Sequence, residues 1–240
     1  METTETPALS GYDGYLFDLD GVLTPTASVH MLAWRTMFSE LFTQWSVAEP
    51  YSDADYFASL DGKKRYEGVQ SLLATRGIEL PYGSPDDEPG NTSVCAIGNL
   101  KNVVFLRLLE LEPVAPYVGS LHLLDELQGS PLAVVSSSKN AEQVLVSAGL
   151  RDRFAVVVDG TVAEREDIPS KPAPDMFRSA AERLGADPAN CIAFEDALSG
   201  VASARSAGVA LVVGVDRGVG EEALMREGAH IVVEDLGDFL

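Results

Sequence analysis

Two carboxylates lie two residues apart at the end of an apolar segment, and this arrangement suits phosphoryl transfer. The segment Tyr15–Asp18 is apolar up to its last residue, and Asp20 and Gly21 follow it. In extended chain, residues i and i+2 point to the same side, and a glycine lets the backbone turn sharply. We therefore expect Asp18 to attack phosphorus and Asp20 to donate and accept the proton, with a divalent cation offsetting the negative charge. A polar turn after a strand is the simpler alternative for this pair.

Three later segments place polar side chains where a strand ends or a helix starts. The hydroxyl-rich run Ser136–Asn140 could hold phosphate oxygens, or it could cap a helix. Lys171 precedes a helix and could balance the charge of the nucleophile and the phosphoryl group, or it could lie at the surface. Glu195 and Asp196 offer the oxygen ligands that Mg²⁺ prefers, although Asp196 could instead cap the next helix. Four such signals in one chain favour a joint site over four unrelated structural roles.

The elements that must position these residues are predicted by six short apolar runs. The runs are rich in Val, Ile and Leu without strict alternation, which is typical of a sheet covered on both faces. Helices are predicted between the later runs, and each ends at a glycine. This alternation implies parallel strands and an α/β fold with a Rossmann-like core. The predicted strands are Tyr15–Asp18, Leu132–Ser136, Ala155–Val158, Ile192–Glu195, Ala210–Val215 and Ile231–Val233, and the predicted helices are Lys139–Ala148, Pro174–Leu184 and Leu198–Ala207.

The stretch between the first two predicted strands has a different pattern and predicts helices without a buried strand. Its apolar residues gather in three crowded groups, around Trp34, Leu72 and Phe105. We expect a helical cap domain, residues 29–112, inserted after the first strand into a core domain of residues 1–28 and 113–240. Links over residues 24–28 and 113–119 would join them, and a loop rich in Pro, Gly and Asp is predicted over residues 79–99.

The composition argues against several classes of function. The 240 residues contain 17 Lys and Arg against 37 Asp and Glu, and the net charge of −20 disfavours nucleic acid and anionic membranes as partners. Cys95 and Cys191 show no disulfide or metal-ligand spacing. The acidic start of the chain does not resemble a signal peptide, and no apolar run approaches the roughly 18 residues of a membrane span. We expect a soluble, cytoplasmic monomer that acts on a small phosphorylated substrate.

These residues together resemble the haloacid dehalogenase-like hydrolase superfamily, and within it the β-phosphoglucomutase-like group. The segment with Asp18 and Asp20 resembles the superfamily's first motif, Ser136 its second, Lys171 its third and the pair Glu195–Asp196 its fourth. The resemblance implies that Asp18 is the nucleophile and a metal ligand, and that Asp20 is the acid/base and gives its backbone carbonyl to Mg²⁺. The second motif would hold phosphate, the third would balance charge, and the fourth would complete the metal site.

Residues of the predicted cap carry the resemblance to the subgroup. Thr26 and His30 match positions that couple cap closure to the placement of the acid/base aspartate. Gly62 and Arg65 resemble a segment whose arginine grips the distal phosphate of the substrate, and Lys101 resembles a cap lysine that contacts the substrate. A guanidinium offers a planar fork to phosphate oxygens. Without the resemblance, Arg65 and Lys101 would be interpreted as solvated helix charges.

One further run and one departure bear on the activity that the resemblance implies. Ser138, Lys139 and Asn140 match a run that helps to bind the phosphosugar, whereas Pro25 stands where the mutases commonly have an acid. The implied activity is that of a phosphohexose mutase, which converts β-glucose 1-phosphate to glucose 6-phosphate through an aspartyl phosphate. A phosphatase for a sugar phosphate or another small metabolite is the alternative, because the same core serves both reactions. A non-catalytic phosphosugar-binding protein is disfavoured, because binding alone needs no nucleophile.

Overall fold

The computed structural model describes residues 9–60, 63–112 and 114–240. The chain divides into two units, one of residues 1–25 and 114–240 and the other of residues 26–113. The first unit contains the sheet, and the second is helical in its described residues. Gly62, a predicted substrate contact, lies outside the described residues.

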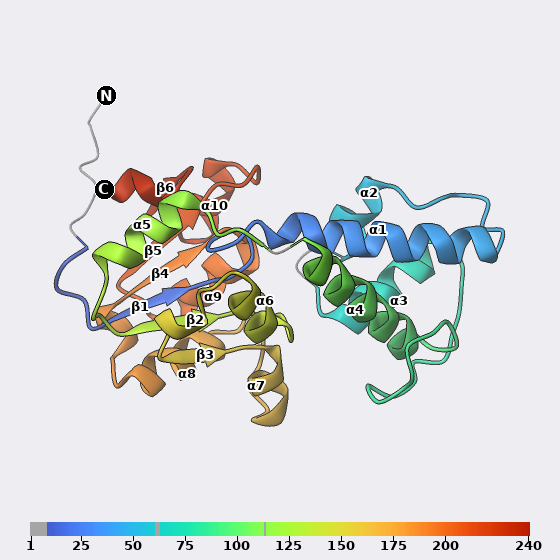
Figure 1. Cartoon of the computed structure of the whole chain (residues 1–240), viewed down its shortest axis with the longest axis horizontal. Coiled ribbons are helices and arrows are strands. Elements are labelled where there is room, and N and C mark those ends of the chain that lie inside the picture. Colours follow the sequence, from blue (N-terminus) through green and yellow to red (C-terminus); the bar gives the residue numbers. More distant parts are fainter. Residues whose placement is uncertain (1–8, 61–62, 113) are drawn as a thin grey trace. The chain divides into compact units, whose positions relative to one another are not determined.

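All six predicted strands are present, and they form one sheet in the order β3-β2-β1-β4-β5-β6 (Figure 1). Every neighbouring pair is parallel, which confirms the predicted α/β fold class. The sequence predicts that Asp18 and Ser136 are the last residues of their strands, but each strand ends one residue earlier. The strands are β1 Gly14–Phe17, β2 Leu132–Val135, β3 Val156–Val158, β4 Cys191–Glu195, β5 Leu211–Val215 and β6 Ile231–Val233.

The helices of this unit connect the strands or follow them. α8 and α9 match the predicted helices closely, but α6 begins two residues later than predicted. The reason is a hydroxyl turn: Ser138 Oγ accepts a hydrogen bond from the Asn140 N–H at 3.2 Å and holds the backbone outside the helix. The helices are α5 Val118–Glu126, α6 Ala141–Ser147, α7 Gly160–Arg165, α8 Asp175–Leu184, α9 Leu198–Ala207 and α10 Glu221–Glu227, with short 3-10 turns at Arg151–Arg153, Pro188–Asn190 and Leu236–Phe239.

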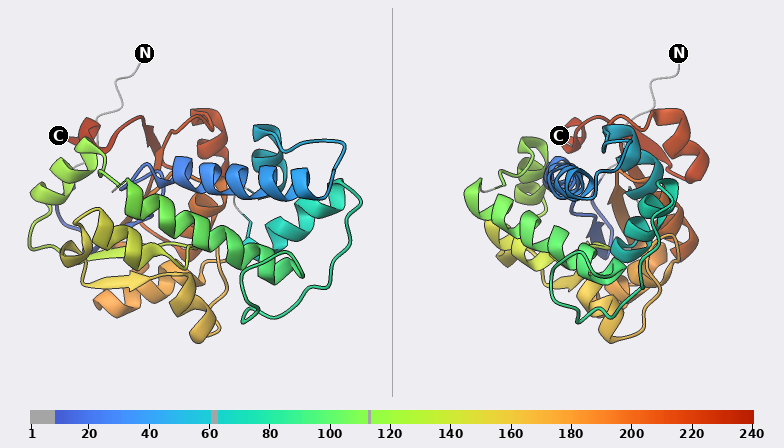
Figure 2. Two further views of the ribbon diagram at one scale, coloured as in Figure 1. Left: turned by 45° about the vertical axis from the view of Figure 1, so that its right-hand side comes forward. Right: turned by 90° about the vertical axis from the view of Figure 1, so that its right-hand side faces the viewer.

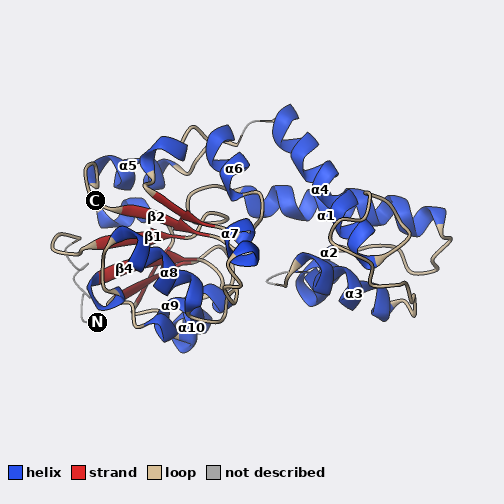
Figure 3. Cartoon of the chain, turned by 90° about the horizontal axis from the view of Figure 1, so that it is seen from below, coloured by secondary structure: helices blue, strands red, loops and turns tan. Residues whose placement is uncertain are grey.

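Helices cover both faces of the sheet (Figure 3). On one face, α8, α9 and α10 pack through small and medium side chains, among them Ala180, Val201 and Leu224, against strand residues such as Leu16. α5 and α6 lie on the other face. Phe17 points away from Leu16 by strand alternation, and its ring stacks on Phe194 with centroids 4.5 Å apart. The strand that carries the predicted nucleophile is therefore buried on both faces and held by its neighbours.

The second unit is formed by two long helices, α1 Thr26–Gln44 and α4 Val94–Leu111, which lie side by side (Figure 2). The shorter elements α2 Asp53–Asp55, the π-helix η1 Tyr56–Leu60 and α3 Arg65–Thr75 complete it. Its described residues contain no strand. The predicted link over residues 24–28 is wrong in its second half, because α1 already begins at Thr26. Among the described residues, no helix combines the length and apolar character that a membrane crossing requires.

The loop predicted over residues 79–99 is shorter than expected. Ser93 caps α4 by accepting a hydrogen bond from the Ala96 N–H at 3.0 Å, so the last six residues of the predicted loop are helical. The remaining loop is fastened to this helix. Asn99 donates to the carbonyls of Pro85 and Asp87 at 3.0 and 2.8 Å. The Pro, Gly and Asp content therefore marks an ordered connection within the second unit.

Candidate active site

The sheet register brings the predicted site residues of the core to one edge. Phe17 pairs with Val134 on one side and with Phe194 on the other. The next residues along the three strands, Asp18, Val135 and Glu195, therefore stand level at the carboxyl end of the sheet. The N–H of Asp18 also donates to the Phe194 carbonyl at 2.9 Å. The chain continues from β1 to β2 on one side of it and later forms β4 on its other side. Open parallel sheets bind ligands at such a switch point.

Lys171 is the central cation of this edge. Its ammonium lies 2.6 Å from Asp18 Oδ1, 2.5 Å from Glu195 Oε1 and 2.7 Å from the Val135 carbonyl, which matches the three donors of an ammonium. The lysine side chain is 6% exposed. Burial lowers the pKa of Lys171, but the charges of Asp18 and Glu195 outweigh it and hold that pKa above its usual value. Lys171 is thus a fixed, protonated partner of the predicted nucleophile and not a surface lysine.

Asp18, Glu195 and Asp196 form an acidic cluster in which one carboxylate oxygen from each lies within 4.8 Å of the others. Burial raises the pKa of Asp18 despite its bond to Lys171. Burial, together with the charges of Asp18, Glu195 and Asp20, raises the pKa of Asp196 well above its usual value. When ionised, the three carboxylates and one ammonium sum to −2, the charge that one divalent cation offsets. The donor set, three carboxylates, suits a hard cation that takes oxygen ligands.

The two acids at the end of β4 have different surroundings. Glu195 Oε1 contacts Lys171 and Glu195 Oε2 accepts the N–H of Ala197 at 3.2 Å. Burial raises the pKa of Glu195 to about 7, with Lys171 opposing the rise. Asp196 lies against Gly21, where an added Cβ would come within 1.9 Å of its Oδ2. Glu195 therefore chiefly positions Lys171, whereas Asp196 is directed at the turn that follows Asp20.

Asp20 lies in a turn whose backbone is fixed. The N–H of Gly21 donates to the Thr24 carbonyl at 2.7 Å, and the N–H groups of Leu23 and Thr24 both donate to the Leu19 carbonyl at 3.0 Å. In a trans peptide the C=O points away from the N–H, so the bond of Gly21 also fixes the direction of the Asp20 carbonyl. Gly21 has φ of +87°, a conformation that suits glycine. The turn thus orients the carbonyl that the sequence predicts as a metal ligand.

The hydroxyl run after β2 forms two successive turns. Ser136 is buried, and its Oγ accepts the N–H of Ser138 at 3.1 Å. Ser138 Oγ in turn accepts the N–H of Asn140, which is the residue before α6. The alternative that a serine of this run caps α6 is wrong, because Asn140 occupies the N-cap position. Ser136 directly follows the strand beside β1, at the same sheet edge as Asp18.

Lys139 faces a different element from the other residues of this run. Its ammonium lies 2.6 Å from Glu164 Oε2 on α7, and both side chains are partly exposed. The Lys139 backbone carbonyl also accepts a hydrogen bond from Thr161 Oγ1 at 3.4 Å. The structure therefore places Lys139 beside α7, where Glu164 competes with any anion for the ammonium.

In the second unit, Lys101 and His30 form a buried pair. Lys101 is 2% exposed, and its ammonium donates to His30 Nδ1 at 2.6 Å. The same ammonium lies 4.6 Å from the Phe105 ring centre and 5.1 Å from that of Trp34, within the range of cation–π contacts. Burial lowers the pKa of His30 well below its usual value, and the nearby charges of Lys101 and Arg65 add to the effect. His30 is thus a neutral imidazole that accepts at Nδ1 and carries its proton on Nε2.

Arg65 and Thr26 stand at helix starts. Arg65 opens α3, and its Nη2 donates to Asn102 Oδ1 on α4 at 2.9 Å. Thr26 opens α1 and is fully buried, one turn before His30. Besides burial, the charges of Lys101 and Arg65 both lower the pKa of His30, so these two residues belong with Asn102 to one polar group of the second unit.

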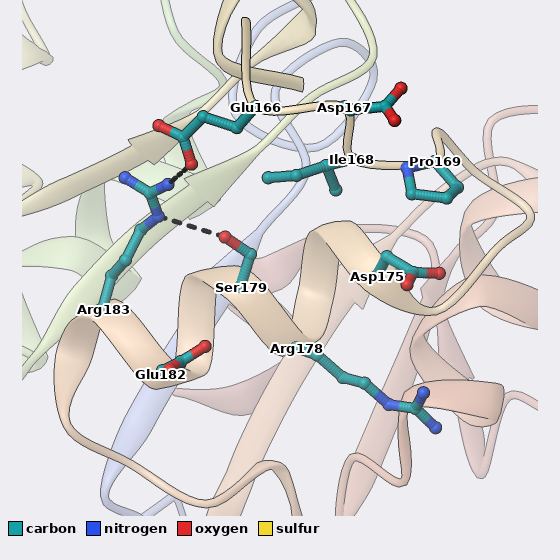
Figure 4. Close-up of a pocket in the computed structure, with 9 residues that line it drawn as sticks. All are labelled: Glu166, Asp167, Ile168, Pro169, Asp175, Arg178, Ser179, Glu182 and Arg183. Atoms are coloured by element: carbon teal, nitrogen blue, oxygen red, sulfur yellow. Dashed lines mark hydrogen bonds and ion pairs between the residues drawn. The ribbon is translucent and has the colours of Figure 1, made fainter. Parts of the chain in front are cut away.

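A surface hollow of about 580 Å³ lies elsewhere on the first unit, between α8 and the segment that precedes Lys171 (Figure 4). Within it, Arg183 forms an ion pair with Glu166 and donates to Ser179 Oγ at 3.1 Å. Arg178 donates to the Ser206 carbonyl. No residue predicted as catalytic or binding lines this hollow, and its arginines already bind protein groups.

Sequence reasoning missed two features of the core site. Gly200 on α9 lets the Glu195 carboxyl approach the helix, because an added Cβ would lie 1.9 Å from Glu195 Oε1. A glycine inside a predicted helix is the only signal of such an approach in the sequence. Arg217, after β5, reaches the turn beyond Asp20 by donating to the Gly21 carbonyl at 2.7 Å. A lone arginine in a loop offers no signal at all.

Comparison with known proteins identifies a family and several named relatives. The family model described as haloacid dehalogenase-like hydrolase matches residues 12–208. A β-phosphoglucomutase of Mycobacterium bovis is 45% identical over 237 residues, covering 94% of this chain and 90% of that protein. The fructose-1-phosphate phosphatase YqaB of Escherichia coli is 31% identical over 82% of this chain and 94% of its own. The crystal structure of β-phosphoglucomutase from Clostridium difficile has a TM-score of 0.74 and 26% identity, covering 95% of this chain and 92% of that one.

We predict that Gly200→Ala destabilises the protein, although alanine is favoured over glycine in helices by about 1 kcal/mol. The new methyl group would displace the Glu195 carboxyl from Lys171, and such overpacking typically costs about 1–3 kcal/mol. Urea denaturation measures the free energy of unfolding. Ser206→Ala, at an exposed position of the same helix, is the control and should change that free energy by less than about 0.5 kcal/mol. A Gly200→Ala protein as stable as wild type would contradict this account of Glu195.

Proposed function

We propose that this chain, which belongs to the haloacid dehalogenase-like hydrolase family, is a β-phosphoglucomutase-like phosphohexose mutase. It would convert β-glucose 1-phosphate to glucose 6-phosphate by passing a phosphoryl group through Asp18. The single observation that carries the proposal is the buried contact of Lys171 with Asp18 inside the acidic cluster. The relative of 45% identity that is named β-phosphoglucomutase supports the choice of substrate.

The core residues have distinct roles in the proposed reaction. A carboxylate oxygen of Asp18 attacks phosphorus and forms an aspartyl phosphate, while Asp20 protonates the departing sugar oxygen. In the second half of the reaction, Asp20 takes the proton of the accepting sugar hydroxyl, and the oxygen of that hydroxyl attacks the aspartyl phosphate. Lys171 balances the charge of Asp18 throughout, and the buried Ser136 hydroxyl is proposed to hold a phosphate oxygen.

Mg²⁺ fits the acidic cluster as the cation of this reaction. We propose that the carboxylates of Asp18 and Asp196 and the backbone carbonyl of Asp20 hold it, and that Glu195 completes the site through its carboxyl. When bound, the ion supplies positive charge that reduces repulsion between Asp18 and the phosphoryl group. The net charge of −2 that the cluster carries when its three carboxylates are ionised supports a divalent ion in this place.

The second unit supplies the features that favour a mutase. A mutase must hold a sugar bisphosphate, so it needs an anion site besides the one at Asp18. We propose that Arg65, Lys101 and Gly62 contribute to that site and that Ser138, Lys139 and Asn140 bind the phosphosugar from the core. Thr26 and His30 are proposed to couple closure of the second unit to the placement of Asp20. The neutral state of His30 suits this role, since its Nε2–H can donate a hydrogen bond.

A phosphatase for a small phosphorylated metabolite is the second candidate. The 31% identical relative from Escherichia coli is named a fructose-1-phosphate phosphatase, and the same core chemistry hydrolyses the aspartyl phosphate when water reaches it. The ion pair of Lys139 with Glu164 also favours this candidate, because it engages one of the proposed phosphosugar contacts.

A ³¹P NMR time course distinguishes the candidates. The protein is mixed with Mg²⁺, β-glucose 1-phosphate and a trace of glucose 1,6-bisphosphate, and we expect glucose 6-phosphate to accumulate. Asp18→Asn should lower the rate at least about a thousandfold, because it removes the nucleophile. Inorganic phosphate as the main product would identify a phosphatase instead, and an unchanged spectrum would exclude these glucose phosphates as substrates.

Replacing Arg65 tests the proposed second anion site. A charge-assisted hydrogen bond contributes about 1.5–3 kcal/mol, so Arg65→Ala should lower kcat/KM for the mutase reaction roughly 10- to 100-fold. Hydrolysis of acetyl phosphate, which has no distal phosphate, should change by less than about threefold. Arg107→Ala, an exposed position on α4, is the matched control. Equal losses on both substrates would show that Arg65 does not grip the distal phosphate.

The acidic cluster predicts opposite effects of Asp196→Asn on stability and on metal binding. The folded-state pKa of Asp196 is raised, so its ionised form opposes folding at neutral pH, and Asp196→Asn should increase the melting temperature without metal. In wild type, Mg²⁺ at 100 times its dissociation constant should stabilise by about 2.7 kcal/mol. The Asp196→Asn variant should lose most of this stabilisation by Mg²⁺. Differential scanning calorimetry with and without Mg²⁺ measures both, and an undiminished increment would exclude Asp196 as a ligand.

A further inference from the structure

Three successive backbone carbonyls after Asp20 are each held by a residue distant in sequence. The Gly21 carbonyl accepts from Arg217 Nε at 2.7 Å, and the Val22 carbonyl accepts from Ser120 Oγ at 2.7 Å. The Leu23 carbonyl accepts the N–H of Tyr117 at 3.0 Å. These donors lie beyond the end of β5 and at the start of α5, and all belong to the first unit. The turn that bears Asp20 is therefore fixed from outside as well as by its own hydrogen bonds.

Arg217 links the parts of this arrangement. Its guanidinium carbon lies 3.9 Å from the centre of the Tyr117 ring, and its Nη1 donates to the Glu234 carbonyl at 2.8 Å. One planar group thus contacts the turn after Asp20, the residue before α5 and the segment after β6. A lysine could not do the same, since an ammonium lacks both the flat face and the fork of donors.

The loop that carries Arg217 is held by hydrogen bonds of its own. The Asp216 N–H donates to the Val233 carbonyl at 2.8 Å, and Asp216 Oδ1 accepts the N–H groups of Gly218 and Gly220 at 2.8 and 3.0 Å. Arg217 Nη2 is buried and has no hydrogen-bond partner among the described residues. Burying a donor without an acceptor opposes folding. This cost is part of placing the guanidinium where its Nε reaches the Gly21 carbonyl.

Gly21 connects Arg217 to the reacting groups. It follows Asp20 directly, and its Cα lies against the Asp196 carboxylate so closely that a Cβ there would overlap Oδ2. A shift of the Gly21 peptide would move the backbone of Asp20 and press on Asp196. The side chain of Asp18, in contrast, is fixed by Lys171. Loss of the Arg217 contact should thus disturb the proton-transferring residue more than the nucleophile.

We propose that Arg217 is a positioning residue for Asp20, acting with Tyr117 and Ser120 as a clamp on the carbonyls of residues 21–23. The proposal rests on the proposed function for the role of Asp20, but the clamp itself rests on the contacts above. Without the clamp, Asp18 is still phosphorylated when the leaving group needs no proton. Transfer from a sugar phosphate slows, because the departing sugar oxygen requires a well-placed acid.

The decisive experiment compares Arg217→Lys with wild type in single-turnover phosphorylation of the protein with Mg²⁺. Two donors are used: acetyl phosphate, whose acetate leaves without protonation, and glucose 1,6-bisphosphate, whose sugar oxygen must be protonated. A well-placed general acid contributes about 100- to 10,000-fold, so the rate with the bisphosphate should fall tenfold or more. The rate with acetyl phosphate should fall less than threefold. Arg178→Lys is the control, since Arg178 also donates to a backbone carbonyl, that of Ser206. Equal losses with both donors, or no loss, would overturn the proposal.

Hydrogen exchange of the full-length protein tests the clamp independently of activity. Peptides that cover residues 19–25 should exchange at least tenfold faster in Arg217→Lys than in wild type or Arg178→Lys, with peptides of β2 and β4 unchanged. Ser120→Ala should accelerate the same peptides to a smaller extent, because it removes one carbonyl contact. Unchanged exchange in both variants would refute the clamp. If wild type were phosphorylated by neither donor, the proposed function would fail, and the exchange data would still decide whether the clamp exists.

Discussion

The buried ammonium of Lys171 is the interaction on which the site depends. It brings Asp18 and Glu195, from neighbouring strands, into contact with one cation and with the Val135 carbonyl of a third strand. Removing it would leave two carboxylates buried without compensation, and breaking a buried ion pair in this way typically costs about 3–5 kcal/mol. The sheet register sets these groups level with one another, and the lysine makes their close approach tolerable. The nucleophile is therefore positioned by the interaction that also offsets its charge.

The remaining charge of the cluster shows a conflict between folding and function. Burial beside other acids raises the pKa of Asp196. Gly21 and Gly200 have no side chains that would push Asp196 and Glu195 away. A core designed for stability alone would fill this space with apolar side chains. The chain instead keeps negative charge at the sheet edge, and a divalent cation is the simplest partner that offsets it. The buried carboxylates thus destabilise the protein in the absence of a ligand, and a bound cation would remove this destabilisation.

Sequence patterns predicted the strands well, because apolar runs in a doubly covered sheet are distinctive, and they placed Asp18, Lys171, Glu195 and Asp196 at strand ends or before a helix. The joint site followed, since the ends of parallel strands share one edge. What the sequence could not predict depends on tertiary contacts. Arg217 lies 196 residues from the carbonyl it binds, and no local pattern marks it. The start of α4 was missed because composition does not distinguish a capping serine such as Ser93 from the loop before it.

The second unit buries positive charge, whereas the core site gathers negative charge. Lys101 is nearly fully buried, and its ammonium faces the rings of Trp34 and Phe105 and donates to His30. That donation fixes the His30 tautomer, and burial, with the charges of Lys101 and Arg65 adding to it, lowers the pKa of His30 well below its usual value. Arg65, bound to Asn102 on the same helix as Lys101, adds a second cation to this polar group. An enzyme that only hydrolysed small phosphate esters would gain little from two oriented cations outside its catalytic core. The burial of Lys101 and the fixed position of Arg65 therefore favour a substrate that carries a second anionic group, as a sugar bisphosphate does.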